Sequence, residues 1–275
     1  MIALFIVLGI LLLLCALYLV LIAPGRRANL DGFCRPYAHR GLWQAANGIP
    51  ENSLAAFDAA CRRGYAMELD VQLAKDGVVM VFHDYTLKRM CGAEGKLVDK
   101  TAAELAALRL ADTDEKIPTF AEVLALVDGR APLLVELKGE TANDALCEAV
   151  AALLDNYHGA YVIESFNPLL LAWFAKHRPQ VVRGLLADDM FAKKKQRTFA
   201  RRLRDMVIQW RLLNVSARPQ FLAWNLHAKH TLTDRILLAL FRIPSFCWTA
   251  RTAAEFDAAT ADGAVPIFDS IPDKW

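Results

Sequence analysis

The sequence predicts an α/β protein, a (β/α)₈ TIM barrel that follows one N-terminal transmembrane helix. Residues 2–22 form an apolar run without charge or proline. After it, short apolar runs rich in strand-forming residues alternate with helical patterns, which is typical of a parallel sheet with crossover helices. The remaining about 250 residues match the usual size of one such barrel.

The first segment, residues 1–24, is predicted to be an uncleaved membrane anchor. Its apolar run is long enough to span ~30 Å of hydrocarbon as a helix. A secretory signal is the competing interpretation, but no Lys or Arg precedes the run and no convincing cleavage site follows it. Arg26, Arg27 and Arg35 lie on the C-terminal side. The positive-inside rule therefore predicts a single-pass inner-membrane protein with its main domain in the cytoplasm.

After a linker over residues 25–35, the catalytic barrel domain is predicted over residues 36–275. Eight parallel strands are expected at Pro36–Arg40, Ala66–Val71, Leu133–Leu137, Ala160–Glu164, Val181–Leu186, Phe221–Asn225, Ser245–Trp248 and Ala264–Phe268. Capping-box patterns predict helix starts at Thr101, Thr119 and Thr252. Eight strands favour a closed barrel. The alternative is an open doubly wound sheet, but no Gly-rich phosphate loop opens an early helix.

One apolar run, Val78–His83, follows Glu68–Leu73 too closely for a parallel strand, because a parallel crossover needs a dozen or more residues. The two runs are therefore predicted to form a hairpin that turns at Asp76-Gly77. Folding the chain there brings His83 roughly opposite Asp70, above the barrel mouth. Residues 84–118 contain no obvious barrel strand and are predicted to be a small insertion over the mouth.

Charge and cysteine content exclude some classes of protein and suggest a second membrane contact. The formal net charge of +2 predicts no bulk attraction to nucleic acid. Six scattered cysteines without a CxxC pair favour buried, reduced thiols. Residues 193–204 hold seven Lys and Arg residues. They are interpreted either as a solvated basic helix or as an amphipathic segment resting on an anionic leaflet.

Charged residues and histidines recur at the predicted strand ends, which converge on one mouth in a barrel. Glu68 and Asp70 share one face of their strand, as do Glu136 and Lys138 of the next strand. Three carboxylates on one rim would repel unless a hard divalent cation, Mg²⁺ or Ca²⁺, offset their charge. The Lys138 ammonium, with the guanidinium of the strand-one arginine, would attract an anionic substrate. Two histidines at strand ends can accept and donate protons near neutral pH.

Each of these residues is a weak signal by itself, but their order along the chain is specific. From about residue 36 onward the sequence resembles the glycerophosphodiester phosphodiesterase family, and its N-terminal anchor resembles the membrane-associated bacterial branch. The segments that carry the resemblance are His39-Arg40-Gly41, Pro50-Glu51-Asn52-Ser53, Glu68-x-Asp70, His83-Asp84, Glu136-x-Lys138 and Asp269-x-x-Pro272.

The resemblance implies a role for each of these positions. It implies one divalent metal ion held by Glu68, Asp70 and Glu136, and an acid–base pair formed by His39 and His83. It also implies that Arg40 and Lys138 bind the phosphate and that Phe166 and Trp248 form apolar walls of the cavity. Glu51 would support the metal cluster or contact the glycerol hydroxyls.

The implied reaction releases sn-glycerol 3-phosphate and an alcohol. Two choices stay open: which histidine is the base, and whether water or a glycerol hydroxyl is the nucleophile. A lysophospholipase D or another phospholipase on the same barrel is the first alternative, with a lysolipid as substrate. A catalytically inactive membrane scaffold is the second. Neither the head group nor the oligomeric state can be predicted from the sequence.

Overall fold

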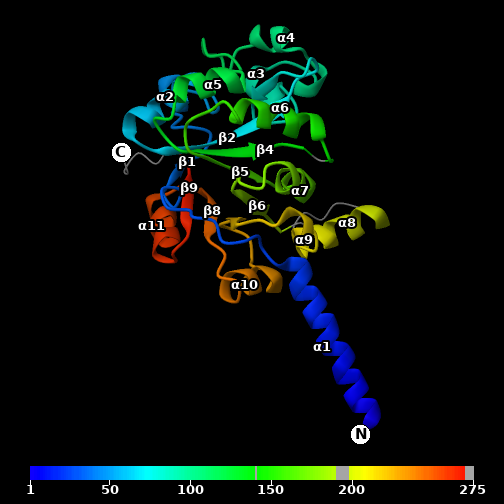
Figure 1. The fold of residues 1–275 in the computed structure, drawn as a ribbon. Helices are drawn as coiled ribbons and strands as arrows, with labels where there is room; N and C mark the ends of the chain where they lie inside the picture. Colours follow the sequence, from blue (N-terminus) through cyan, green and yellow to red (C-terminus); the bar gives the residue numbers. More distant parts are fainter. Residues whose placement is uncertain (140, 190–197, 270–275) are drawn as a thin grey trace.

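The computed structural model describes residues 1–139, 141–189 and 198–269. Figure 1 shows a barrel domain from which one long helix, α1 (Ile2–Ile22), projects away. Nearly all of α1 is exposed, and it is long and apolar enough to cross a membrane.

The predicted barrel is confirmed. Eight parallel strands close on themselves, because β1 pairs with both β2 and β9. The ninth strand, β3, is antiparallel to β2 and lies outside the barrel wall. The strands are β1 Tyr37–Ala38, β2 Ala66–Leu73, β3 Val79–Val81, β4 Leu133–Leu137, β5 Tyr161–Ser165, β6 Arg183–Ala187, β7 Phe221–Asn225, β8 Ser245–Ala250 and β9 Val265–Phe268.

Helices connect the strands and begin at side-chain caps. The predicted capping boxes are present at Thr101, Thr119 and Thr252, and a further one occurs at Thr231. Besides α1, the helices are α2 Leu54–Arg63, α3 Lys88–Cys91, α4 Ala102–Ala106, α5 Phe120–Val127, α6 Asp144–Leu154, α7 Pro168–His177, α8 Phe199–Gln209, α9 Asn214–Ala217, α10 Leu232–Ala239 and α11 Ala253–Ala261.

The β2–β3 hairpin is present, but its register differs by one residue from the prediction. Val71 pairs with Val81, so Asp70 lies opposite Phe82 and not His83. The turn holds three residues, with Gly77 at a φ of 83°, where the prediction placed two. The buried Gln72 amide donates hydrogen bonds to the carbonyl oxygens of Phe82 and Asp84, at 2.8 and 2.9 Å. This fixes the backbone on both sides of His83.

The residues expected to form the linker and the insertion both pack against the barrel. Leu30 is buried in an apolar cluster with Tyr37 and Phe246, strand residues that point into the barrel. Residues 84–118 contain α3 and α4 and bury an apolar cluster of their own against Met80 and Phe82. The insertion thus supports the hairpin that carries His83.

The C-terminal end of α1 is attached to the barrel through side-chain contacts. The Tyr18 hydroxyl is hydrogen-bonded to Thr233 at 2.5 Å, and its ring lies edge-on to Trp210. The Asn214 side chain donates a hydrogen bond to the carbonyl oxygen of Ile22 at 3.1 Å. Of the basic segment 193–204, residues 193–197 lie outside the described residues, and the rest belongs to α8 and its N-cap.

Candidate active site

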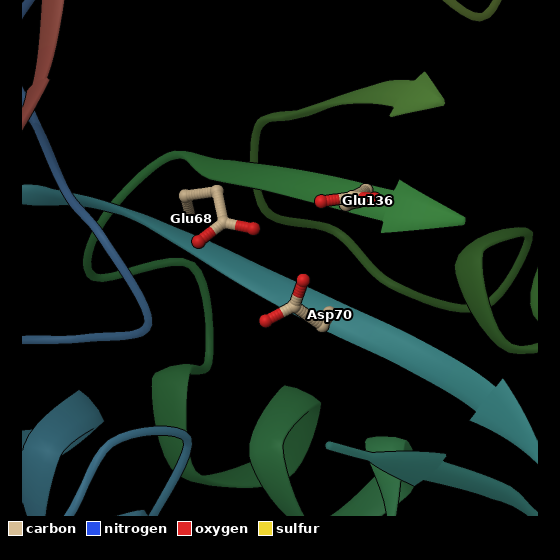
Figure 2. A group of neighbouring side chains, drawn as sticks. All are labelled: Glu68, Asp70 and Glu136. Carbon is tan, nitrogen blue, oxygen red and sulfur yellow. The ribbon is translucent and has the colours of Figure 1, made fainter. Parts of the chain in front are cut away.

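Three carboxylates meet at the adjoining strands β2 and β4. Glu68 and Asp70 lie on β2, and Asp70 pairs in register with Glu136 on β4. Ligand oxygens of the three side chains lie within 4.8 Å of one another. Figure 2 shows their carboxylates pointing toward a common space between the two strands.

A fourth buried carboxyl group, which the sequence analysis did not single out, lies beside this cluster. Glu164 of β5 pairs in register with Glu136 and is 1% exposed, and its Oε2 atom has no hydrogen-bond partner. Burial and the charges of Glu136 and Asp70 raise its pKa well above the ordinary value.

The acidic groups respond differently to their surroundings. Burial and the charges of Asp70 and Glu136 raise the pKa of Glu68 well above its ordinary value. Burial also raises the pKa of Glu136, to about 7, although Lys138 opposes the shift. Asp70 is buried too, but its contacts with Lys138 and Arg40 outweigh burial and hold its pKa below the ordinary value.

Two cations contact the carboxylates. The Lys138 Nζ atom lies 3.0 Å from Asp70 and 2.9 Å from Glu136. The Arg40 backbone N–H donates to Glu68 at 2.9 Å, and its guanidinium lies 3.5 Å from Asp70. Arg40 has a φ of 59°, a left-handed conformation that non-glycine residues rarely adopt and that functional sites often hold.

The charge balance and the donor set fit a hard divalent cation. Four buried carboxyl groups face two cations among the described residues, so full ionisation leaves an excess of buried negative charge. The unpartnered Glu164 oxygen and the raised pKa values of Glu68 and Glu136 both reflect carboxyl groups that are buried close together with too few cations among the described residues. Carboxylate oxygens are the ligands that Mg²⁺ and Ca²⁺ prefer.

Both histidines line the same cavity as Glu68, Glu136 and Glu164, a space of about 290 Å³. The His39 Nδ1 atom lies 2.7 Å from Asp269, at the end of β9. Arg251 donates to the other oxygen of that carboxylate at 3.2 Å. With Nδ1 donating to Asp269, the Nε2 atom of a neutral His39 is free to accept a proton. Burial lowers the pKa of His39, although Asp269 opposes the shift.

His83 has the same kind of partner. Its Nδ1 atom lies 2.6 Å from Asp84. Burial lowers its pKa, and the nearby Asp70 opposes the shift. Arg89, in the insertion, donates to Asp84 at 2.6 Å and to Glu51 at 2.7 Å. The insertion therefore contributes a side chain that orients the partner of one histidine.

The Pro50–Ser53 segment connects these groups. Glu51 accepts a hydrogen bond from Arg40 at 2.7 Å, and the buried Asn52 amide donates to Asp70 at 2.8 Å. The Ser53 hydroxyl accepts from a backbone N–H and caps α2. Gly41 is required nearby, since its φ is 80° and a Cβ atom there would lie 2.9 Å from Ala56. The segment thus orients both the arginine and a carboxylate.

Aromatic rings form one wall of the cavity. Phe166 and Trp248 stand edge to face, with ring centroids 5.5 Å apart, and both line the space between the histidines. All ten residues predicted for the site therefore lie in or around one region. Two of the ten are not among the residues that line the cavity: Glu51, which contacts the arginines, and Asp70, which is held by Lys138 and Asn52.

The sequence analysis assigned no role to Asn52, Asp84, Arg89, Glu164 or Asp269. Three of them stand within the segments that carried the family resemblance, so their positions were visible and only their partners were not. Glu164 ends a predicted strand, where a lone glutamate is a weak signal. Arg89 lies in the insertion, for which no pattern predicted a contact with the site.

Comparison with known proteins agrees with this geometry. The model of the glycerophosphoryl diester phosphodiesterase family matches residues 39–270. The glycerophosphodiester phosphodiesterase of Caldanaerobacter subterraneus is 34% identical over 162 residues, which cover 54% of this chain and 65% of that protein.

Two solved structures share the fold. A glycerophosphodiester phosphodiesterase from Thermotoga maritima has a TM-score of 0.62 and 28% identity, covering 85% of this chain and 93% of that one. A phosphodiesterase from Oleispira antarctica, solved in complex with the product sn-glycerol-3-phosphate, has a TM-score of 0.69 and 22% identity, covering 87% and 94%.

Proposed function

The chain belongs to the glycerophosphoryl diester phosphodiesterase family and is a phosphoric diester hydrolase, and from this premise we propose that it cleaves glycerophosphodiesters with one divalent metal ion and two histidines. The products are sn-glycerol 3-phosphate and an alcohol. The observation that most strongly supports this function is that His39 and His83 line one cavity with Glu68, Glu136 and Lys138.

The residues around the cavity divide the chemistry between them. Glu68, Asp70 and Glu136 would hold the cation, with Mg²⁺ and Ca²⁺ as candidates. When bound, the cation would offset charge on the phosphoryl oxygens. Arg40 and Lys138 bind the same oxygens, and Glu51 orients Arg40 through their 2.7 Å hydrogen bond.

The two histidines move the protons. One accepts a proton from the nucleophile, which is water or the neighbouring glycerol hydroxyl, and the other donates a proton to the departing alkoxide. A bond forms between phosphorus and the nucleophile as the bond to the alcohol oxygen breaks. Burial lowers the pKa of both rings. A lowered pKa suits the ring that accepts a proton, and the ring that donates must carry its extra proton before the step.

Chelation tests the proposal. The purified full-length protein is assayed with glycerophosphocholine, and release of glycerol 3-phosphate is measured. EDTA should abolish turnover, and adding Mg²⁺ or Ca²⁺ should restore it. Full activity in chelator would contradict the metal site, and no turnover with any divalent ion would favour an inactive scaffold. Glycerophosphoethanolamine and glycerophosphoglycerol in the same assay would define the head group.

We also propose that α1 anchors the enzyme in the inner membrane with the barrel in the cytoplasm. The length and apolar character of α1 support an anchor, and Arg26, Arg27 and Arg35 after it support this orientation. Cys34 is exposed close to the end of the anchor. A membrane-impermeant maleimide should label it only after cells are opened, with Cys34→Ser as the control. Labelling in intact cells would reverse the orientation.

A further inference from the structure

We propose that a groove beside the catalytic cavity binds the acyl chain of a single-chain glycerophospholipid, so that the enzyme also acts on lysophospholipids drawn from the membrane. The inference rests on the proposed function, because the groove leads into the same catalytic cavity.

The groove has a volume of about 360 Å³ and lies between the ends of β5 and β6 and the helices that follow them. Its apolar walls are formed by Leu169 of α7, by Val207 and Ile208 of α8, and by Phe166 after β5 and Leu213 before α9, with Arg204 of α8 also in the lining. Phe166 and Asp188 also line the catalytic cavity. An acyl chain in the groove would therefore place its glycerophosphate head toward the histidines.

The outer wall of the groove is α8, in which polar side chains are buried and large apolar side chains are exposed, the reverse of the usual pattern in a surface helix. In α8 the polar residues Asp205 and Gln209 are buried, at 2% and 8% exposure. An apolar stripe at helical spacing points outward instead, formed by Phe199, Leu203, Met206 and Trp210, with exposures of 83%, 47%, 42% and 50%. An exposed apolar stripe of this kind marks an interaction surface, and arginines beside it favour an anionic lipid surface.

The position of α8 identifies lipid as the apolar partner. Trp210, at the end of the stripe, lies edge-on to Tyr18 of α1, with ring centroids 6.1 Å apart. Tyr18 also bonds to Thr233 of α10, and both Leu232 of that helix and its C-cap Leu240 are exposed. Figure 1 shows α8 and α10 on either side of the barrel end of α1, from which the rest of α1 extends away. The stripe is therefore continuous with the membrane anchor.

The size of the groove fits one acyl chain, which selects a lysophospholipid over a two-chain lipid. The reaction would be the one already proposed. The phosphorus–oxygen bond to the head-group alcohol breaks, and a new bond forms from phosphorus to the water oxygen. The histidines transfer one proton from the water and one to the alcohol. The products are lysophosphatidate and the free alcohol.

A homologous series of substrates tests the groove. The full-length protein in nanodiscs, supplied with Mg²⁺ or Ca²⁺, is assayed with glycerophosphocholine and with hexanoyl, decanoyl and tetradecanoyl lysophosphatidylcholine, and choline release is measured. We expect kcat/KM to rise with chain length, by about fourfold for each methylene group that becomes buried, until the groove is filled. Turnover of glycerophosphocholine with no dependence on chain length would overturn the groove alone. Absence of turnover with every substrate would overturn the proposed function as well.

A matched pair of variants separates the groove from the membrane surface. Leu169→Asp places a charge in the groove, at an exposed position in the first turn of α7, where an acidic residue suits the helix. Leu232→Asp makes the same change in the first turn of α10, outside the groove. Leu169→Asp should abolish the chain-length dependence while glycerophosphocholine turnover stays unchanged, and Leu232→Asp should preserve the dependence. Equal loss in both variants, or none in Leu169→Asp, would overturn the proposal.

Discussion

The catalytic cavity and the face formed by α1, α8 and α10 depart from the usual distribution of residues in opposite directions. At the cavity, Glu68, Asp70, Glu136 and Glu164 are buried carboxyl groups. At the α8 face, large apolar side chains are exposed and polar ones are buried. Both arrangements cost free energy in water, and each becomes favourable with a partner of matching chemistry.

The difference shows that the chemistry of each region indicates the kind of partner that it binds. Excess negative charge around fixed hydrogen bonds fits a cation and, through Arg40 and Lys138, the phosphate of a substrate. An apolar stripe beside a long apolar helix fits lipid. Removing either partner, or either anomaly, should therefore have effects confined to its own region.

The largest expected effect is at the histidines. His39→Ala or His83→Ala should lower kcat by at least ~100-fold, the usual scale of general acid–base catalysis. Steady-state turnover of glycerophosphocholine checks this, with binding of the variants to nanodiscs unchanged. Near-normal turnover in either variant would remove that histidine from the mechanism.

The charge excess predicts a pH effect on stability. The pKa of Glu136 rises from 4.5 to about 7 on folding, so protonated Glu136 favours the folded state. This contribution is complete below pH 4.5 and is lost as pH rises to 7, an effect of at most about 3 kcal/mol. Glu136→Gln cannot ionise. In chelator, thermal unfolding should show the variant gaining stability relative to the wild type over this range, and Mg²⁺ should stabilise the wild type preferentially.

The pKa values of Glu68 and Glu164 depend on the charge of Glu136, so the difference between the two proteins reports that charge together with its effect on these neighbours. A difference in melting temperature that does not change with pH would show that burying the charge of Glu136 costs no free energy. The cavity would then lack the buried charge excess that sets it apart from the α8 face.

A smaller effect is expected at Asp269, a positioning residue for His39. Asp269→Asn should lower kcat by about tenfold, since a partner that orients a functional histidine typically contributes on this scale. Asp269 also raises the pKa of His39 against the effect of burial. The variant should therefore shift the limb of the kcat/KM profile that His39 controls to lower pH, which is the acidic limb if His39 is the base and the alkaline limb if it is the acid. An unshifted profile would mean that the 2.7 Å contact does not control His39.

The smallest effect is expected on the α8 face, which we propose contacts lipid. Trp210 is half exposed on the α8 stripe. Brominated lipids in nanodiscs should quench part of the tryptophan fluorescence, and Trp210→Phe should remove most of the quenched component without changing glycerophosphocholine turnover. Trp43→Phe, a substitution in the barrel domain, serves as the comparison. Equal quenching in wild type and Trp210→Phe would exclude α8 from the lipid surface.

Much of the fold could be predicted from the sequence because the information is local. Buried parallel strands appear as apolar runs, and every expected strand lies within a few residues of an observed one. The hairpin register was wrong by one residue. A loop of two or three residues satisfies the same Asp76-Gly77 signal, and only the pairing of Val71 with Val81 distinguishes them.

Contacts between distant residues could not be predicted in the same way. His39 and Asp269 lie 230 positions apart and meet only because β1 pairs with β9. Glu164 joins the cluster through its register with Glu136. On α8 the apolar and basic residues were visible, but a helical pattern alone does not say which face packs on the barrel. That Asp205 is buried and Phe199 exposed is a property of the tertiary structure.

The attachment of α1 to the barrel has a mechanical consequence. The Gly25 N–H donates to the carbonyl oxygen of Pro219 at 2.9 Å, and Asn214 holds the last turn of α1. These two hydrogen bonds restrict bending between the end of α1 and the barrel. With α1 inserted as we propose, the tilt of the barrel and the height of its mouth above the lipid head groups would be set by the fold itself. A few glycines added after Ala23 would turn this rigid mount into a loose tether.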